Sequence, residues 1–178
     1  MLGAVYGNQK NKQVYRKKVN LVIGGFVALL AISSLAFSTL LIVLFGNTDV
    51  VPEQSTGNFH WNLIGVVLAL ATSLSLLNQF KTRPYMEEVL YVWKLKQLHN
   101  KIFRKLKSIK AASAEHDVKA LTILKFYYTT QSQVFELDNN TLTMSSVNKE
   151  LEAIEQIEAA KSLDLDITSF EESWIDTY

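Results

Sequence analysis

The sequence contains no cysteine, only two prolines and only seven glycines, none of them after Gly65. The absence of cysteine excludes a disulfide framework, a thiol nucleophile and metal sites built on thiolates. The scarcity of proline and glycine excludes collagen-like and linker-like classes, and the glycine-free C-terminal part lacks the usual phosphate-binding loops. With 48% hydrophobic residues over 178 positions, the chain is too apolar to be disordered. Its length suits one ordinary domain, or a membrane anchor with a small domain.

Two long apolar runs dominate the N-terminal half. Residues 21–45 are 25 positions without a charge, and residues 61–80 are 20 such positions. At ~1.5 Å per residue, helices of these lengths reach across the ~30 Å hydrocarbon core of a bilayer. The first run is too long for the apolar part of a signal peptide. For the second run, a buried helix of a soluble protein is the alternative. Both runs are predicted to be transmembrane helices, because only an internal hydrogen-bond ladder satisfies the backbone in lipid.

The distribution of charge predicts how these helices are oriented. Residues 1–20 carry a net charge of +5, residues 46–58 carry −2, residues 81–110 carry +7 and residues 111–178 carry −9. Basic flanks of membrane helices stay on the cytoplasmic side. Both termini are therefore predicted to be cytoplasmic, with the short acidic loop outside.

The predicted fold is an all-α membrane protein, in which a two-helix transmembrane hairpin is followed by a small cytoplasmic helical bundle. The expected segments are a basic cytoplasmic N-terminal segment, the first span, an external loop, the second span and the cytoplasmic helical domain, at 1–20, 21–45, 46–58, 59–80 and 81–178. No ionisable residue lies inside the apolar runs, which argues against a transporter.

Small residues predict how the two spans contact each other. Gly24 and Ala28 form one small-xxx-small pair, and Gly65, Ala69 and Ser73 form a longer stripe. Such stripes let helices approach closely in lipid. We expect the two stripes to face each other within one chain, in preference to mediating dimerisation.

An amphipathic helix is predicted to follow Pro84, with apolar positions repeating in steps of three and four. The candidate helix-packing seam consists of Leu95, His99, Ile102, Leu106 and Ile109. His99 is interpreted as a buried polar residue that fixes the register, in preference to a catalytic one. Met86, Val89, Leu90 and Trp93 are predicted to extend the apolar side.

The same helix carries a candidate basic interaction surface, formed by Lys94, Lys101, Arg104, Lys105 and Lys107. Three interpretations compete. In the first and preferred one, the acidic segment 111–178 folds back onto this helix. In the second, the lysines and arginine contact anionic lipid. Nucleic acid ranks last, because the whole cytoplasmic part is close to neutral.

The remaining helices are predicted from caps and turns. A second cytoplasmic helix is expected over residues 117–137, and the run 137–141 indicates a turn. Thr143 or Ser145 is expected to cap a third helix. Thr168 and Glu171 match a capping box for a short last helix.

Several strings, taken together, resemble a known family. They are Phe59-His60-Trp61-Asn62-Leu63 and Gly65-Val66, then Pro84, Glu88-Val89 and Tyr91-Val92-Trp93, and finally Leu137-Asp138-Asn139-Asn140-Thr141. The chain resembles a domain-of-unknown-function family of small two-span bacterial inner-membrane proteins. The resemblance implies a multi-pass protein of the bacterial inner membrane, and it implies no activity, substrate or catalytic residue.

The sequence offers no catalytic constellation. His60, His99 and His116 are not spaced as metal ligands, and the two acids Asp164 and Asp166 are interpreted as solvated residues near a helix end. No catalytic residue, cofactor or metal is therefore expected, and the chain is not expected to be an enzyme. The predicted function is that of a membrane-anchored helical interaction or scaffold module. The alternatives are an accessory subunit of a membrane enzyme complex and a peripheral helix that binds anionic lipid. The expected partners are membrane lipid and a protein, either a second copy or an unknown chain.

Overall fold

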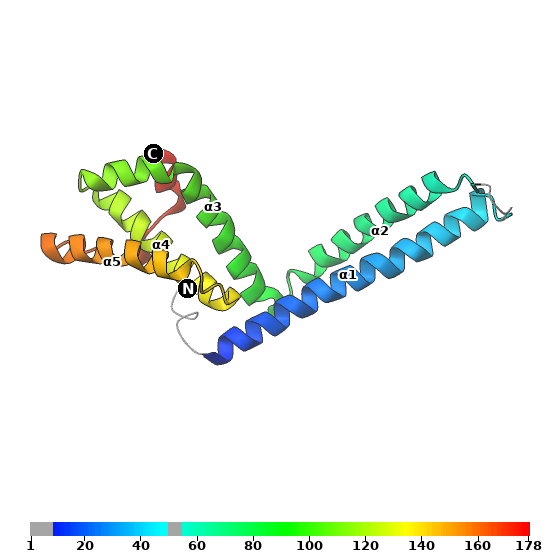
Figure 1. Cartoon of the computed structure of the whole chain (residues 1–178), viewed down its shortest axis with the longest axis horizontal. Helices are drawn as coiled ribbons and strands as arrows, with labels where there is room; N and C mark the ends of the chain where they lie inside the picture. Colours follow the sequence, from blue (N-terminus) through cyan, green and yellow to red (C-terminus); the bar gives the residue numbers. More distant parts are fainter. Residues whose placement is uncertain (1–8, 50–54) are drawn as a thin grey trace. The chain divides into compact units, whose positions relative to one another are not determined.

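The computed structural model describes residues 9–49 and 55–178, and every regular element in these ranges is helical. The helices are α1 (Gln9–Phe45), α2 (Phe59–Phe80), α3 (Glu87–Ala114), α4 (Val118–Asp138) and α5 (Met144–Lys161), with 3-10 helices η2 (Pro84–Met86), η3 (Ile167–Ser169) and η4 (Glu172–Thr177) (Figure 1). The predicted all-helical class is confirmed. Glu53 of the predicted external loop and the first eight residues lie outside the described ranges.

The chain divides into two compact units, which we describe separately. Residues 17–87 form the helix-pair unit, and residues 88–178 form the C-terminal unit together with the part of α1 before residue 17. α1 begins at Gln9, about three turns before the apolar run. Pro84 lies at the first position of η2, where its missing N–H costs no hydrogen bond.

In the helix-pair unit, α1 and α2 lie side by side (Figure 1). The Ser38 hydroxyl donates to the Asn62 carbonyl at 3.3 Å, and the Phe45 and Trp61 rings stack with centroids 5.4 Å apart. At the loop, Asn47 and Asn58 exchange two hydrogen bonds of 2.9 and 2.6 Å. These contacts fix the register of the two helices at the end where the loop joins them.

The prediction about small residues is half confirmed. Gly65, Ala69 and Ser73 are the buried residues of α2. Gly24 and Ala28 are exposed, so the prediction that their stripe faces α2 is wrong. The closest approach instead joins Gly65 to the backbone of Ser38, which is buried on α1. A glycine on one helix and a serine on the other are enough to bring the two backbones together.

In the C-terminal unit, α4 is the central element. Its buried residues lie on most sides of the helix rather than on one stripe. A helix that is apolar all round is covered all round, and α4 contacts α5, η3 and η4 as well as α3. The largest fully buried side chains of this unit include Ile102 and Ile109 from α3 and Leu121 and Ile123 from α4.

Local signals set the boundaries of α4. Asp117 caps its first turn, because its carboxylate accepts from the backbone N–H groups of Lys119 at 2.8 Å and Ala120 at 3.2 Å. At the other end, Asn139 adopts the left-handed conformation with φ 60°, as the predicted turn requires. Thr143 occupies the N-cap position of α5, but its side chain makes no capping hydrogen bond.

The predicted capping box of Thr168 and Glu171 is wrong. Asp166 caps η3 by accepting from the Thr168 N–H at 2.8 Å, and Glu171 lies at the N-cap of η4 without a side-chain capping hydrogen bond. The hydrogen bonds from Thr168 lower the pKa of Asp166. The Thr168 hydroxyl does not act as a capping acceptor but donates to the Asp166 carboxylate, at 2.7 Å from Oδ1 and 2.6 Å from Oδ2.

Candidate interaction surface on α3

The predicted seam of α3 is covered inside the C-terminal unit. Leu95, His99, Ile102 and Ile109 are buried, and Leu106 is half-buried. His99 marks the contact with α4, since its Nε2 lies 2.8 Å from the Thr130 hydroxyl and its ring meets Tyr127 edge-on at 5.4 Å. Because the seam is already occupied within the chain, we do not propose it as an interface between two copies.

His99 is held neutral by its surroundings. The Thr130 hydroxyl donates its single hydrogen to the Phe126 carbonyl at 2.6 Å, so it accepts from His99, which assigns the imidazole proton to Nε2. Burial and the charge of Lys96 lower the pKa of His99 to about 4. A buried neutral imidazole that joins α3 to α4 fits the predicted register-fixing role.

Three lysines of α3 pair with acids of the segment 111–178. Lys96 contacts Asp138 at 2.6 Å, and Lys110 contacts Glu150 at 2.8 Å. On the other side of the seam, Lys101 contacts η4 through two acids, Glu172 at 3.2 Å and Asp176 at 3.0 Å. This is the intramolecular arrangement that the first interpretation of the basic surface predicts. All these pairs are partly exposed, so each is worth at most about 1 kcal/mol.

Four residues of the predicted basic surface remain exposed: Lys94, Arg104, Lys105 and Lys107. Within residues 12–49 and 55–178, none of the four has an ion-pair partner. Lys101 differs from them because its ammonium group donates hydrogen bonds to Glu172 and Asp176 of η4. The basic surface is therefore smaller than predicted, and it faces away from the buried seam.

Two aromatic side chains beside these charges were not predicted to be exposed. Trp93 is 56% exposed and Phe103 is 65% exposed. The expectation that Trp93 extends the apolar side of α3 is wrong. Its spacing of 11 residues from Arg104 and 14 from Lys107 puts all three on one helix face, and this spacing was the signal available in the sequence.

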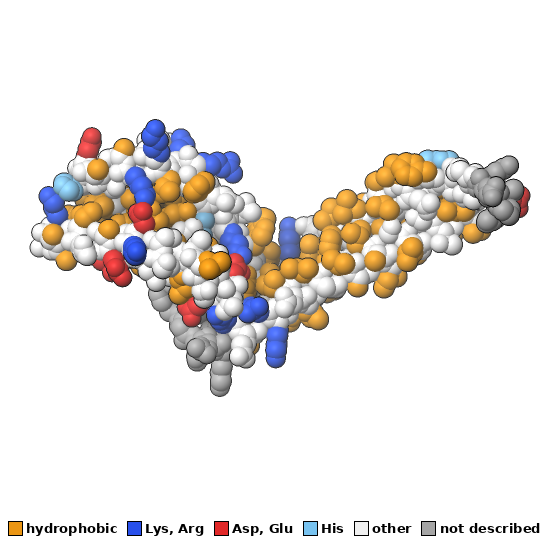
Figure 2. Space-filling model, viewed as in Figure 1, with side chains coloured by type: hydrophobic (Ala, Val, Ile, Leu, Met, Phe, Trp, Pro, Cys, Tyr) orange, Lys and Arg blue, Asp and Glu red, His pale blue; other side chains and the backbone are white. Residues whose placement is uncertain are grey.

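We call this group the basic–aromatic surface of α3, comprising Trp93, Lys94, Phe103, Arg104, Lys105 and Lys107. Figure 2 shows Lys and Arg side chains gathered over the C-terminal unit where α3 runs. Tryptophan and arginine are the residue types that contribute most energy at protein interfaces. The same combination also characterises helices that lie at a lipid headgroup region.

A further ion pair, between α4 and α5, holds the C-terminal unit together. Lys125 of α4 contacts both carboxylate oxygens of Glu158 at 2.6 and 2.8 Å, and Glu158 also accepts from the Leu165 N–H at 3.0 Å. Burial acts to raise the pKa of Glu158, but these hydrogen bonds outweigh it and leave the pKa below the ordinary value.

Glu158→Gln is expected to destabilise the C-terminal unit by about 2 kcal/mol, because it removes charge-assisted hydrogen bonds from a mostly buried lysine. The pKa of Glu158 is lower in the folded chain than in the unfolded chain. Its contribution to the free energy of unfolding is therefore complete at a pH above the ordinary pKa, and it is lost as the pH falls through the pKa of the folded chain. Urea unfolding at pH 7 measures the effect. Glu155→Gln is the control, because Glu155 is exposed on the same helix. Equal midpoints for the two variants would contradict this prediction.

The residues considered for metal binding lie apart from this surface. Asp166 caps η3, while His60 and His116 are exposed at separate places. In the part of the chain that the structure describes, no three His, Asp or Glu side chains gather in a group that could hold a metal ion.

Comparison with known proteins gives the family of the chain and no activity. No curated protein matches the chain, and no solved structure matches it. One family model covers residues 8–175, which include both apolar helices and nearly all of the C-terminal unit. The chain therefore belongs to the family described as "Protein of unknown function (DUF3087)".

Proposed function

We propose that this chain is a multi-pass protein of the bacterial inner membrane, in which α1 and α2 form a transmembrane hairpin that anchors a cytoplasmic helical bundle. In this proposal the bundle works without catalysis and presents the basic–aromatic surface of α3 to a partner. The observation that carries the proposal is the uncovered apolar surface of α1 and α2, two helices long and apolar enough to cross a membrane.

The exposed side chains of the helix-pair unit support membrane insertion. Ile32, Leu35 and Val43 of α1 and Val67 and Leu74 of α2 are all at least 50% exposed. Figure 2 shows hydrophobic side chains over the visible face of this pair, with Lys and Arg only toward one end. A continuous apolar face of this length is unfavourable in water and is satisfied by lipid.

The ends of the helix pair support one orientation. Phe59, His60 and Trp61 begin α2, and aromatic residues favour the membrane–water interface. Lys81 and Arg83 follow the other end of α2. By the positive-inside rule, the basic end lies in the cytoplasm, so both termini are cytoplasmic and the loop between α1 and α2 is external.

Membrane insertion is tested by fractionating cells that express the full chain. We expect the protein to stay in the membrane pellet after carbonate washing and to need detergent for release. A reporter fused after Tyr178 is expected to be active only when it is a type that works in the cytoplasm. Recovery of the unmodified chain in the supernatant after ultracentrifugation would overturn the proposal, and reporter activity outside would reverse the topology.

A protein partner on α3 is tested by photo-crosslinking in intact cells. A photoreactive residue at Trp93 or Phe103 is expected to give a discrete adduct. The same probe at Leu142 is the control, because Leu142 is 91% exposed but lies before α5. Two differently tagged copies in one cell distinguish a second copy of this chain from another protein. Identical adduct patterns at Phe103 and Leu142 would contradict the assignment of the surface.

Contact with anionic lipid is the second candidate, favoured by the exposed Trp93 beside Arg104 and Lys107. Each basic residue near an anionic surface is worth about 1 kcal/mol. In nanodiscs, this candidate predicts slower hydrogen exchange of α3 with phosphatidylglycerol than with phosphatidylcholine. The double change Arg104→Gln and Lys107→Gln should remove that difference. Exchange that is independent of the lipid leaves the protein partner as the supported candidate.

A further inference from the structure

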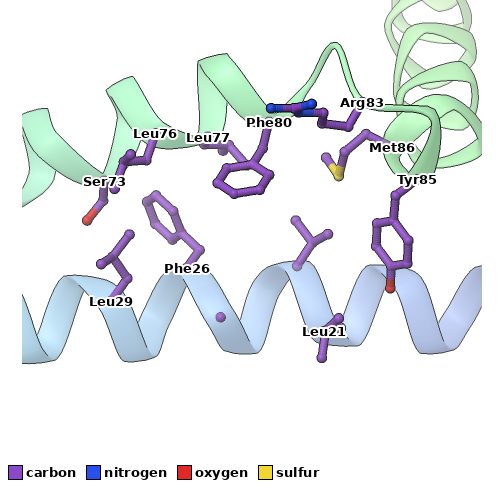
Figure 3. A pocket seen from close by; sticks show the side chains of 12 residues that line it. Leu21, Phe26, Leu29, Ser73, Leu76, Leu77, Phe80, Arg83, Tyr85 and Met86 are labelled. Carbon is purple, nitrogen blue, oxygen red and sulfur yellow. The ribbon is translucent and has the colours of Figure 1, made fainter.

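The helix-pair unit contains a pocket between α1 and α2. Its volume is about 550 Å³, within the roughly 300–1,000 Å³ range of ligand pockets. Apart from Ser73, Arg83 and Tyr85, every residue that lines it is apolar. Figure 3 shows α1 along one side and α2 with the following turn along the other, and Phe26 and Phe80 reach into the space between them.

The dimensions of the pocket suit a lipid chain. Along α1 it extends from Leu21 to Leu29, which corresponds to ~12 Å at the helical rise of ~1.5 Å per residue. One leaflet of a bilayer contributes about half of the ~30 Å hydrocarbon core. The pocket therefore runs along most of one leaflet, where acyl chains are the surrounding solvent.

The charged side chain that lines the pocket lies at one of its two ends. Ser73 and Leu29 lie at one end, whereas Arg83 and Tyr85 lie at the end nearer the turn after α2 (Figure 3). The guanidinium of Arg83 extends back over Phe80, and the Lys18 ammonium lies 5.5 Å from the centre of the Tyr85 ring. Among the residues that the structure describes, no acidic side chain lines the pocket. This end is therefore positive and presents the planar donor group that best recognises phosphate.

We propose that the pocket holds one acyl chain of an anionic phospholipid, with its phosphate at Arg83. This inference rests on the proposed membrane insertion and adds a specific lipid site to it. The apolar length selects an acyl chain, and the adjoining guanidinium selects a negatively charged headgroup over a zwitterionic one. A peptide is disfavoured, because the interior of the pocket offers few groups to hydrogen-bond its backbone.

Two glycines on α1 provide a matched test of the pocket. A Cβ added at Gly25 or at Gly24 meets nothing within 4 Å, so both positions accept a side chain. Only Gly25 lines the pocket. Gly25→Leu should fill part of it and reduce lipid retention about tenfold, as expected from two fewer buried methylene groups. Gly24→Leu, with the same composition, should retain lipid like the unchanged chain.

The measurement is native mass spectrometry of the full chain in mild detergent with added dioleoylphosphatidylglycerol or dioleoylphosphatidylcholine. We expect one phosphatidylglycerol per chain, retained in preference to phosphatidylcholine. Arg83→Gln should reduce that preference about fivefold, the effect of one charge near the headgroup. Lys149→Gln, which removes an exposed charge from the C-terminal unit, should leave it unchanged. Gly25→Ala is a milder replacement that keeps the test usable if the leucine variant does not insert.

Three results would overturn the inference. The first is equal lipid retention by the Gly25→Leu and Gly24→Leu variants. The second is no preference between the two lipids, and the third is a dimer whose mass carries no lipid. In each case the chain would still require detergent for release from membranes, so the proposed function would stand. Failure of the proposed function is recognised separately, by a chain that dissolves without detergent.

Discussion

Replacing Gly65 by leucine is expected to drive α1 and α2 apart. A Cβ at this position would come within 2.6 Å of the Ser38 backbone nitrogen and 2.8 Å of its Cα. Backbone atoms cannot move aside as the end of a flexible side chain can, so one helix must shift. We expect a loss of about 3 kcal/mol in the association of the two helices, at the upper end of the usual cost of overpacking.

Because the chain has no cysteine, crosslinking reports on this packing without background. Cysteines at Leu29 and Ser73, which lie together at one end of the pocket (Figure 3), should react with a short bismaleimide. Gly65→Leu should lower the yield of this crosslink severalfold. Gly24→Leu is the control, because the Cβ at Gly24 meets open space. An undiminished yield in the Gly65 variant would show that the two helices do not meet at this glycine.

The contact face of α1 illustrates what the sequence could not predict. Its apolar run is hydrophobic on every side, so neither periodicity nor the spacing of small residues identifies the face that meets α2. The stripe at Gly65 is recognisable because Gly65, Ala69 and Ser73 are three small residues in succession at a spacing of four. On α1, Ser38 meets it rather than Gly24, because the register is set by contacts at the loop end, such as that of Phe45 with Trp61. The fit between the surfaces of two helices depends on both of them, so it cannot be predicted from the sequence of either helix alone.

The C-terminal unit was more predictable where local chemistry decides the structure. Asp117 begins α4 through its side-chain capping bonds, and Asn139 ends it through its tolerance of the left-handed backbone conformation. The cap of the short last helix is mispredicted because tertiary contacts position this segment. Phe170 stacks on Phe126 of α4 with centroids 4.2 Å apart, and the Tyr178 hydroxyl donates to Asp117 at 2.9 Å. Partners this distant in sequence leave no local pattern to detect.

The basic–aromatic surface also combines features that the sequence predicts with features that depend on tertiary contacts. The sequence identifies its charged residues, but it also assigns Lys101 to the predicted basic interaction surface, although two acids of η4 pair with that lysine. The expectation that Trp93 extends the apolar side of α3 fails because the buried seam is completed by smaller side chains such as Leu95 and Ile102, and Trp93 lies outside it. Helical spacing alone favours the exposed position of Trp93, so periodicity was a better guide here than residue type.

Acidification is expected to destabilise the C-terminal unit through His99. Its folded pKa of about 4 lies below the ordinary value of 6.5, so the unfolded chain takes up a proton that the folded chain excludes. Stability must therefore fall as the pH drops from 6.5 toward 4. Between pH 7.5 and pH 5.0 the loss is about 2 kcal/mol, before most carboxylates begin to titrate. The physical cause is that protonation places a charge among Thr130, Tyr127 and the apolar residues of the seam.

His99→Gln separates this effect from other titrations. Glutamine still offers a donor to Thr130 but cannot be protonated, so we expect a variant that is less stable at pH 7.5 and nearly independent of pH down to 5.0. His116→Asn is the control, because His116 is exposed and asparagine tolerates its left-handed conformation with φ 64°. Urea unfolding of the full chain in detergent, followed by the helix signal, gives the free energy at each pH. If His99→Gln kept the slope of the unchanged chain, the burial of a neutral His99 would not be its cause.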